Sequence, residues 1–149
     1  MVYTHAALCE SMRLYPPVPV GTKEAAKDDV LPDGTFVKKG TRVSYHGTDW
    51  AEFRPERWLN RVQEDEKWRF VSVDPYTYPV FHAGPRDCLG KEMAFLQMKR
   101  VVAGILRRFK VVPVVAEGVE IEYSALLTSV VKGGLPVRIE NRSATKTHE

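Results

Sequence analysis

The sequence predicts a mixed α+β fold with two main helices, at about 4–15 and 91–109, and a series of short β-hairpins. Two segments of helix-forming residues with apolar positions at helical spacing predict the helices. Short runs of β-branched and aromatic residues between glycine and proline turns predict the hairpins. The 149 residues are the usual size of one domain, and 44% hydrophobic residues are enough to build a core.

The composition of the chain excludes several classes of protein. Twenty-two Lys and Arg against nineteen Asp and Glu give a net charge of +3, too small an excess to indicate a nucleic-acid partner. The two cysteines, Cys9 and Cys88, are too few for a disulfide scaffold and favour a reducing compartment. No apolar run approaches the roughly 20 residues that cross a bilayer, and no signal segment opens the chain. We therefore expect a soluble, intracellular chain without an anchor or signal of its own.

The two predicted helices differ in character. The first, over 4–15, is rich in Ala, Leu, Met and Glu, and Thr4 is its expected N-cap. Prolines follow it directly and end it. The second, over about 91–109, carries apolar residues from Ala94 to Phe109 around much of its girth. We therefore expect the second helix to be buried on more than one side.

The remaining elements are predicted as short strands between turns. The expected strands span 30–31, 35–37, 41–45, 111–115, 119–123 and 135–139. Gly133 and Gly134 are expected to form a hairpin turn after 128–132. Pro55 favours a short helix within 50–60, and 61–80, which has no clear period, is predicted as a loop. The last residues, 141–149, are predicted as a disordered tail.

The segment FHAGPRDCLG, residues 81–90, carries the chemistry of the chain. Cys88 lies at the start of the second helix, where unpaired N–H groups favour a thiolate. Gly84 and Gly90 have no side chain, so the backbone can approach a flat ligand closely. Arg86 is suited to bind a carboxylate. These residue types together indicate a metal-bound thiolate beneath a large planar cofactor.

The same segment resembles the haem-binding loop of the cytochrome P-450 monooxygenases, whose pattern is F-x-x-G-x-R-x-C-x-G. All five fixed positions match, at Phe81, Gly84, Arg86, Cys88 and Gly90. The resemblance implies that the cofactor is haem b (iron protoporphyrin IX) and that Cys88 is the axial thiolate ligand of its iron. The alternative for Cys88 is that of most free cysteines, a small buried apolar side chain.

Two further motifs extend the resemblance over 1–140, as a partial domain from the C-terminal portion of that mostly helical fold. Glu10 and Arg13 match the family's E-x-x-R helix, and the Pro-Glu-Arg segment at 55–57 matches its P-E-R segment. The resemblance implies a partly buried network of Glu10, Arg13 and Arg57 that supports the haem pocket. The alternative is an exposed pair worth only ~0.3 kcal/mol. Finer details, such as RLYPPVPVGTKEAAKDDVLPDGT, resemble the plant fatty-acid ω-hydroxylase branch.

Family position implies further roles. Lys23 and His82 are candidates to contact the haem propionates with Arg86, although a solvated lysine and an unrelated loop histidine are the alternatives. A zinc site is not indicated, because no further Cys or His stands at suitable spacing. The positions that correspond to the substrate pocket are Val18, Pro19, Val20, Leu126, Leu127 and Thr128, with ordinary hydrophobic hairpins as the alternative.

The implied activity is hydroxylation of a lipophilic substrate, a fatty acid in the ω-hydroxylase branch, with electrons from NADPH through a reductase. The reductase would bind the basic face of the second helix, made of Lys91, Lys99, Arg100, Arg107 and Arg108, where a merely solvated face is the alternative. The full-length parent would belong to the endoplasmic reticulum membrane.

The chain also departs from the family. It is several times shorter, and no segment matches the long helix that activates oxygen on the distal haem face. We therefore expect a truncated fragment that does not hydroxylate substrate by itself. The alternatives are a non-catalytic haem-binding product and a haem-free one. Neither the exact substrate nor the position of hydroxylation is encoded in recognisable motifs.

Overall fold

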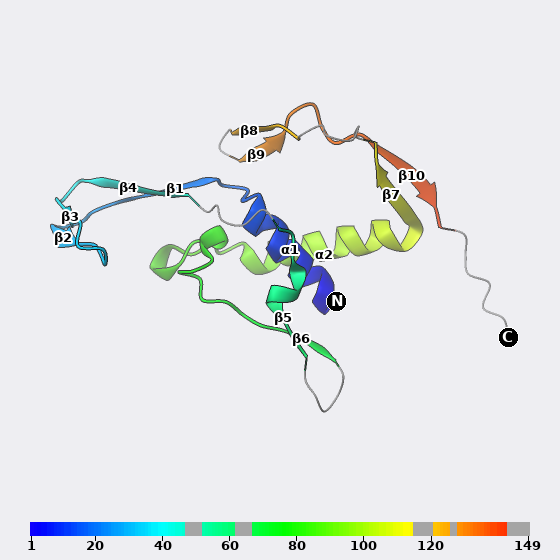
Figure 1. Ribbon diagram of the computed structural model, residues 1–149, viewed down its shortest axis with the longest axis horizontal. Coiled ribbons are helices and arrows are strands. Elements are labelled where there is room, and N and C mark those ends of the chain that lie inside the picture. Colours follow the sequence, from blue (N-terminus) through cyan, green and yellow to red (C-terminus); the bar gives the residue numbers. More distant parts are fainter. Residues whose placement is uncertain (47–51, 62–66, 115–120, 126–127, 143–149) are drawn as a thin grey trace.

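The computed structural model describes residues 1–46, 52–61, 67–114, 121–125 and 128–142. Two α-helices, α1 (Val2–Leu14) and α2 (Lys91–Arg108), cross at the centre of the molecule, and short strands extend outward from them (Figure 1). The strands of the described residues form two-stranded antiparallel ladders. The prediction of a mixed α+β architecture with two main helices is therefore confirmed.

The ends of both helices differ slightly from the prediction. Helix α1 begins at Val2, so Thr4 lies inside it and is not its N-cap. Its last turn closes with a hydrogen bond from Tyr15 N–H to the carbonyl of Ser11, 2.8 Å long, before the prolines end it. Helix α2 ends at Arg108, because Phe109 takes an extended conformation (φ −128°, ψ 150°) and begins β7 (Phe109–Pro113).

The first half of the chain forms three ladders. β1 (Val20–Glu24) pairs with β4 (Arg42–His46), and β2 (Asp29–Val30) pairs with β3 (Phe36–Val37). β5 (Leu59–Arg61) pairs with β6 (Trp68–Phe70), directly after the 3₁₀ turn η1 (Pro55–Trp58). A pure loop over 61–80 was therefore the wrong prediction, because the aromatic residues of β6 return to pair with β5 and the 3₁₀ turn η2 (Pro79–Phe81) follows.

The C-terminal strands pair differently from the prediction. β7 pairs with β10 (Val137–Asn141), and β8 (Tyr123–Ala125) pairs with β9 (Ser129–Val131). Gly133 and Gly134 both have positive φ, 75° and 80°, but they lead from one ladder to the other. The predicted hairpin between 128–132 and 135–139 is therefore wrong. The predicted tail, 141–149, begins one residue too early, since Asn141 belongs to β10, and 143–149 lie outside the described residues.

The buried core lies where the two helices meet. Its residues come from α1, η1 and α2, and they are Ala6, Cys9, Met12, Trp58 and Phe95. Among the described residues of α2, Phe95 is the buried one, whereas Met93, Leu96 and Val101 are 64%, 66% and 58% exposed. The expectation of burial on more than one side is wrong for this structure, because α1 covers a single side of α2. In the part of the chain that the structure describes, neither helix is long and apolar enough to cross a membrane.

Candidate functional site

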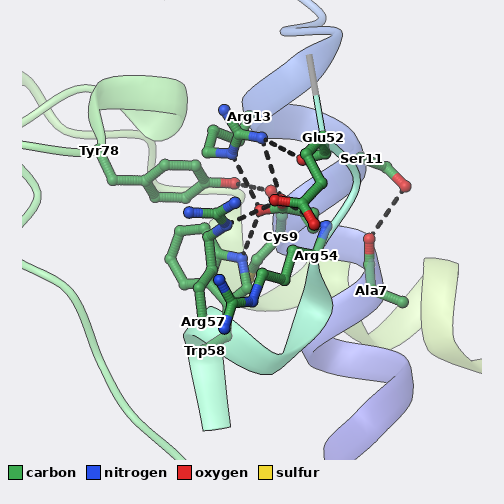
Figure 2. A network of polar contacts seen from close by, with 10 residues as sticks. Ala7, Cys9, Ser11, Arg13, Glu52, Arg54, Arg57, Trp58 and Tyr78 are labelled. Carbon is green, nitrogen blue, oxygen red and sulfur yellow. Dashed lines mark hydrogen bonds and ion pairs between the residues drawn. The ribbon is translucent and has the colours of Figure 1, made fainter. Parts of the chain in front are cut away.

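The carboxylate of Glu10 is the centre of a network that joins α1 to the η1 segment. Arg13 donates from Nε to Oε2 (2.9 Å) and from Nη2 to Oε1 (3.0 Å). Arg57 donates from Nε to Oε1 at 2.9 Å. Figure 2 shows Arg13, Arg57 and Trp58 gathered around the centre of this network. The Glu10 side chain that all three contact is fully buried. The structure thus brings together the three residues of the predicted network, and the geometry is that of a buried cluster instead of an exposed pair.

Two further donors belong to the network, and sequence reasoning missed both. The Nε1–H of Trp58 donates to Oε2 of Glu10 at 2.8 Å, and the backbone N–H of Arg54 donates to Oε1 at 2.8 Å. Trp58 directly follows the Pro-Glu-Arg motif, and a tryptophan N–H beside that motif is the sequence signal that could have indicated a further donor to Glu10. With these donors the two carboxylate oxygens accept five hydrogen bonds, which removes the cost of an unpaired buried charge.

These contacts decide the charge state of Glu10. Burial alone would raise its pKa, but hydrogen bonds from Arg13, Arg54, Trp58 and Arg57 outweigh burial and lower the pKa to about 2, from an ordinary value of 4.5. The carboxylate therefore stays ionised throughout the physiological range. Because the folded pKa lies below the unfolded one, the network stabilises the fold above pH 4.5, and the stabilisation disappears as the pH falls toward 2.

As the pH is lowered from roughly 5 to 2, protonation of Glu10 should reduce the free energy of unfolding by about 3 kcal/mol. Denaturant titrations over that range should show the loss in the wild type and not in Glu10→Gln, which cannot titrate at this position. Parallel pH profiles for the two proteins would contradict the assignment, since the loss would then come from other carboxylates.

Tyr78 connects the network to the segment before the cysteine loop. Its hydroxyl donates to the carbonyl of Cys9 at 2.8 Å, and its ring packs edge-on against Trp58 with centroids 4.6 Å apart. The Cys9 side chain is buried in the core, and this burial raises the pKa of its thiol to about 11. Cys9 is therefore a neutral core thiol at physiological pH, without the reactivity of a thiolate.

The Cys88 loop is built between η2 and α2. The N–H of Cys88 donates to the carbonyl of Phe81 at 2.8 Å, and the N–H of Lys91 donates to the carbonyl of Cys88 at 3.2 Å. Phe81 is half-buried and its ring lies 5.3 Å from that of Phe95, in centroid distance. These contacts fix the backbone on both sides of Cys88 and anchor the loop to the core.

The exposed side of the loop fits a large flat ligand. Cys88 is an exposed free thiol, and the next residue, Leu89, is fully exposed. Gly84 has φ +78°, a backbone conformation that glycine adopts readily and other residues rarely adopt. A Cβ at this position would also lie 3.1 Å from the Tyr76 hydroxyl oxygen. Gly90 precedes α2, and a Cβ there would lie 3.8 Å from the Cys88 sulfur, in ordinary van der Waals contact with it. An accessible soft sulfur flanked by glycines suits an iron centre in a planar macrocycle.

The basic residues near the loop lie on separate elements. Arg86 is exposed at the end of the 3₁₀ turn η3 (Gly84–Arg86), and Lys23 is exposed on β1. His82 is half-buried, and its Nδ1 shares a hydrogen bond with the Tyr45 hydroxyl, 2.9 Å away. One ring nitrogen of His82 is therefore engaged within the protein, while Arg86 and Lys23 present their charges to solvent.

The structure brings together the two segments predicted to border a substrate. The N–H of Ser129 donates to the carbonyl of Pro17 at 2.7 Å, and the rings of Tyr15 and Tyr123 stack with centroids 5.0 Å apart. Val18 and Val20 are 43% exposed beside half-buried Pro19, and Thr128 is exposed. Leu126 and Leu127 lie outside the described residues.

The basic face of α2 is only partly free. Lys91, Arg100, Arg107 and Arg108 are exposed. Lys99 is half-buried, donates to Nδ1 of His5 at 3.3 Å and lies 5.9 Å from the centre of the Phe95 ring. Burial, followed by the charge of Lys99, lowers the pKa of His5. Lys99 therefore contacts α1 through His5, whereas the side chains of the four other basic residues are exposed to solvent.

The comparisons with known proteins find similarity to cytochromes P450. The family model described as cytochrome P450 matches residues 1–136. Cytochrome P450 94A2 of Vicia sativa is 69% identical over 154 residues, and cytochrome P450 94B3 of Arabidopsis thaliana is 49% identical over 154 residues. Each match covers 96% of this chain and 30% of the relative, so the chain spans about 30% of the length of these relatives.

A solved structure shows the same fold. The crystal structure of a cytochrome P450, CYP102L1, superposes with a TM-score of 0.73 at 28% sequence identity. The match covers 95% of this chain and 32% of that chain. The arrangement of helices and ladders described above is thus a portion of a larger known fold.

Proposed function

Because the chain belongs to the cytochrome P450 family, we propose that its Cys88 loop is a haem-thiolate site, in which the Cys88 sulfur would bind the haem iron. The observation that carries the proposal is the exposed Cys88 sulfur, held in a loop whose backbone is fixed by hydrogen bonds at Phe81 and Lys91. Haem, when bound, supplies the oxygen chemistry, and a thiolate ligand favours cleavage of the O–O bond.

The residues of this chain then have distinct tasks. Cys88 provides the ligand, and Gly84 and Gly90 leave room for the flat macrocycle. Arg86 is the proposed partner of a propionate, with Lys23 as a second, because both present exposed cations. Phe81 packs against Phe95 and anchors the loop to the core.

The Glu10 network supports the Cys88 loop indirectly, through α1, η1 and Tyr78. Glu10, Arg13 and Arg57 lock α1 to the η1 segment, and Tyr78 links this assembly to the segment that leads into the loop. Since the network is fully hydrogen-bonded, it fixes one relative position of these elements. We assign it a supporting role for the haem pocket, without contact to a reacting group.

For the longer protein, we propose NADPH-dependent hydroxylation of a lipophilic substrate, with a fatty acid as the favoured class because of the sequence resemblance to plant fatty-acid ω-hydroxylases. The paired segments at Pro17 and Ser129, with exposed Val18 and Val20, support a border of the substrate site. A reductase would contact the exposed cations of α2, at Lys91, Arg100, Arg107 and Arg108. Association with the endoplasmic reticulum membrane is part of the same proposal.

A polypeptide of these 149 residues alone is expected to bind haem without hydroxylating lauric acid. Apolar side chains of α2 are uncovered in it, and the family activates oxygen from a helix with no counterpart among these residues. Grafted into the matching region of a cytochrome P450 that hydroxylates lauric acid, the segment should support NADPH-dependent product formation in the presence of reductase.

The graft carries its own controls, since Cys88→Ala should abolish product and Cys9→Ala should retain it. A graft that binds haem but forms no product would contradict the proposed hydroxylase function. Product from the 149-residue polypeptide itself, lost with Cys88→Ala, would show that the oxygen chemistry needs no further segment.

A further inference from the structure

A hydrogen bond between side chains joins the β1–β4 ladder to the cysteine loop. Tyr45 lies on β4, and its hydroxyl is 2.9 Å from Nδ1 of His82, which directly follows η2. The residues are 37 positions apart in sequence, so this contact joins two parts of the chain that are distant in sequence. Both side chains are half-buried, which makes the hydrogen bond less accessible to competing water.

The ladder is shaped to let the Tyr45 ring reach the loop. Gly21 of β1 is the register partner of Tyr45, and it is buried. A Cβ at Gly21 would lie 2.6 Å from Cε2 of the Tyr45 ring and closer still to Cζ and the hydroxyl. The ring therefore lies across the space where a side chain would stand on β1. Glycine at this position is what admits the ring, and the ring brings the hydroxyl to His82.

His82 has a backbone conformation that needs outside support. Its φ is 60° and its ψ is 179°, a region that is essentially restricted to glycine. Among the described residues, His82 is the one non-glycine residue with positive φ. Its neighbour Phe81 presents the carbonyl that accepts the N–H of Cys88. The conformation of His82 therefore governs whether the hydrogen bond that closes the Cys88 loop can form.

We propose that Tyr45 is a positioning residue for the Cys88 loop. Its hydrogen bond to His82 holds that residue at positive φ, which keeps the Phe81 carbonyl directed at Cys88 N–H and fixes the sulfur in one place. The inference rests on the proposed haem-thiolate function for its purpose, but the loop itself can be tested without haem. It also gives His82 a task within the protein in place of the propionate contact considered from the sequence.

The test compares Tyr45→Phe with Tyr15→Phe, an exposed tyrosine that stacks on Tyr123. Hydrogen–deuterium exchange on the full, haem-free chain reports the loop directly through peptides that cover 81–90. Tyr45→Phe should speed exchange there about threefold to tenfold, the range expected for one lost hydrogen bond, and Tyr15→Phe should leave it unchanged. Unchanged exchange in Tyr45→Phe would overturn the proposal.

A second variant separates positioning from general destabilisation. His82→Gly adopts positive φ without strain, so the Tyr45 hydroxyl should become dispensable in that background. Tyr45→Phe should then have no further effect on exchange in 81–90. An effect of equal size in both backgrounds would show that Tyr45 acts elsewhere and would overturn the proposal.

A spectroscopic readout connects the loop to the haem. After loading with haem, the Tyr45→Phe protein should show a smaller thiolate-type fraction of the reduced carbon-monoxide complex than the wild type. Adding His82→Gly to Tyr45→Phe should restore that fraction. Faster exchange with an unchanged spectrum would reduce Tyr45 to a structural contact and overturn the positioning role. If no variant, including the wild type, gives a thiolate-type spectrum, the proposed function fails, and the exchange data still decide whether Tyr45 orders the loop.

Discussion

Glu10→Gln should destabilise the folded protein by about 3–5 kcal/mol, the usual cost of breaking a buried ion cluster. All five polar contacts of the Glu10 carboxylate come from donors. A glutamine amide must place its own N–H₂ against some of them and leaves the cations of Arg13 and Arg57 without their anion. Denaturant unfolding at neutral pH, followed by circular dichroism, measures the loss.

The matched control for this variant is Glu56→Gln. Glu56 is an exposed carboxylate of η1 that accepts a hydrogen bond from the exposed Tyr3 hydroxyl, 3.1 Å away. Its replacement should cost less than about 0.5 kcal/mol, as at most surface sites. Arg13→Ala should cost about 3 kcal/mol, because it leaves the buried carboxylate under-paired. A loss below half a kcal/mol for Glu10→Gln would show that the cluster does not hold α1 to η1.

Much of the helical framework and of the site could be predicted from local sequence. Helix α1 and helix α2 follow from residue propensity and apolar spacing, with ends misplaced by one or two residues. The motif positions Glu10, Arg13 and Arg57 were also recognisable, because each matches a fixed charged position in a short pattern of the family that the sequence resembles. The contact between Glu10 and Arg57, 47 residues apart, was expected from that resemblance and not from neighbours in the sequence.

Features that depend on distant contacts could not be predicted in this way. Trp58 completes the Glu10 cluster from 48 residues away, and no local pattern specifies that its indole faces a carboxylate. The pairing of β7 with β10 spans the β8–β9 ladder, so the glycine pair at 133–134 gave a turn signal without the strand partner. The hydrogen bond of Tyr45 to His82 depends on the space left by Gly21, which only the folded ladder reveals.

Cys88→Ala is the second change with a large expected effect. Removing the sulfur takes away the only iron ligand proposed for this chain, so haem should dissociate at least about tenfold faster, as metal sites typically weaken when a ligand or its support is lost. The fold should be little affected, since Cys88 is exposed. Cys9→Ala should behave in the opposite way, because Cys9 is a buried core residue and its loss costs stability without changing the ligand. Haem transfer to an acceptor protein, paired with denaturant unfolding, separates the two effects.

The absorption spectrum of the reduced carbon-monoxide complex tests the haem-thiolate assignment most directly. It reports the type of protein ligand that the haem iron would have, independently of substrate, reductase and turnover. We expect a thiolate-type spectrum from the haem-loaded wild type and from Cys9→Ala, and its complete loss in Cys88→Ala. A thiolate-type spectrum that persists in Cys88→Ala, or one that disappears in Cys9→Ala while Cys88 is intact, would contradict the assignment of Cys88 as the iron ligand.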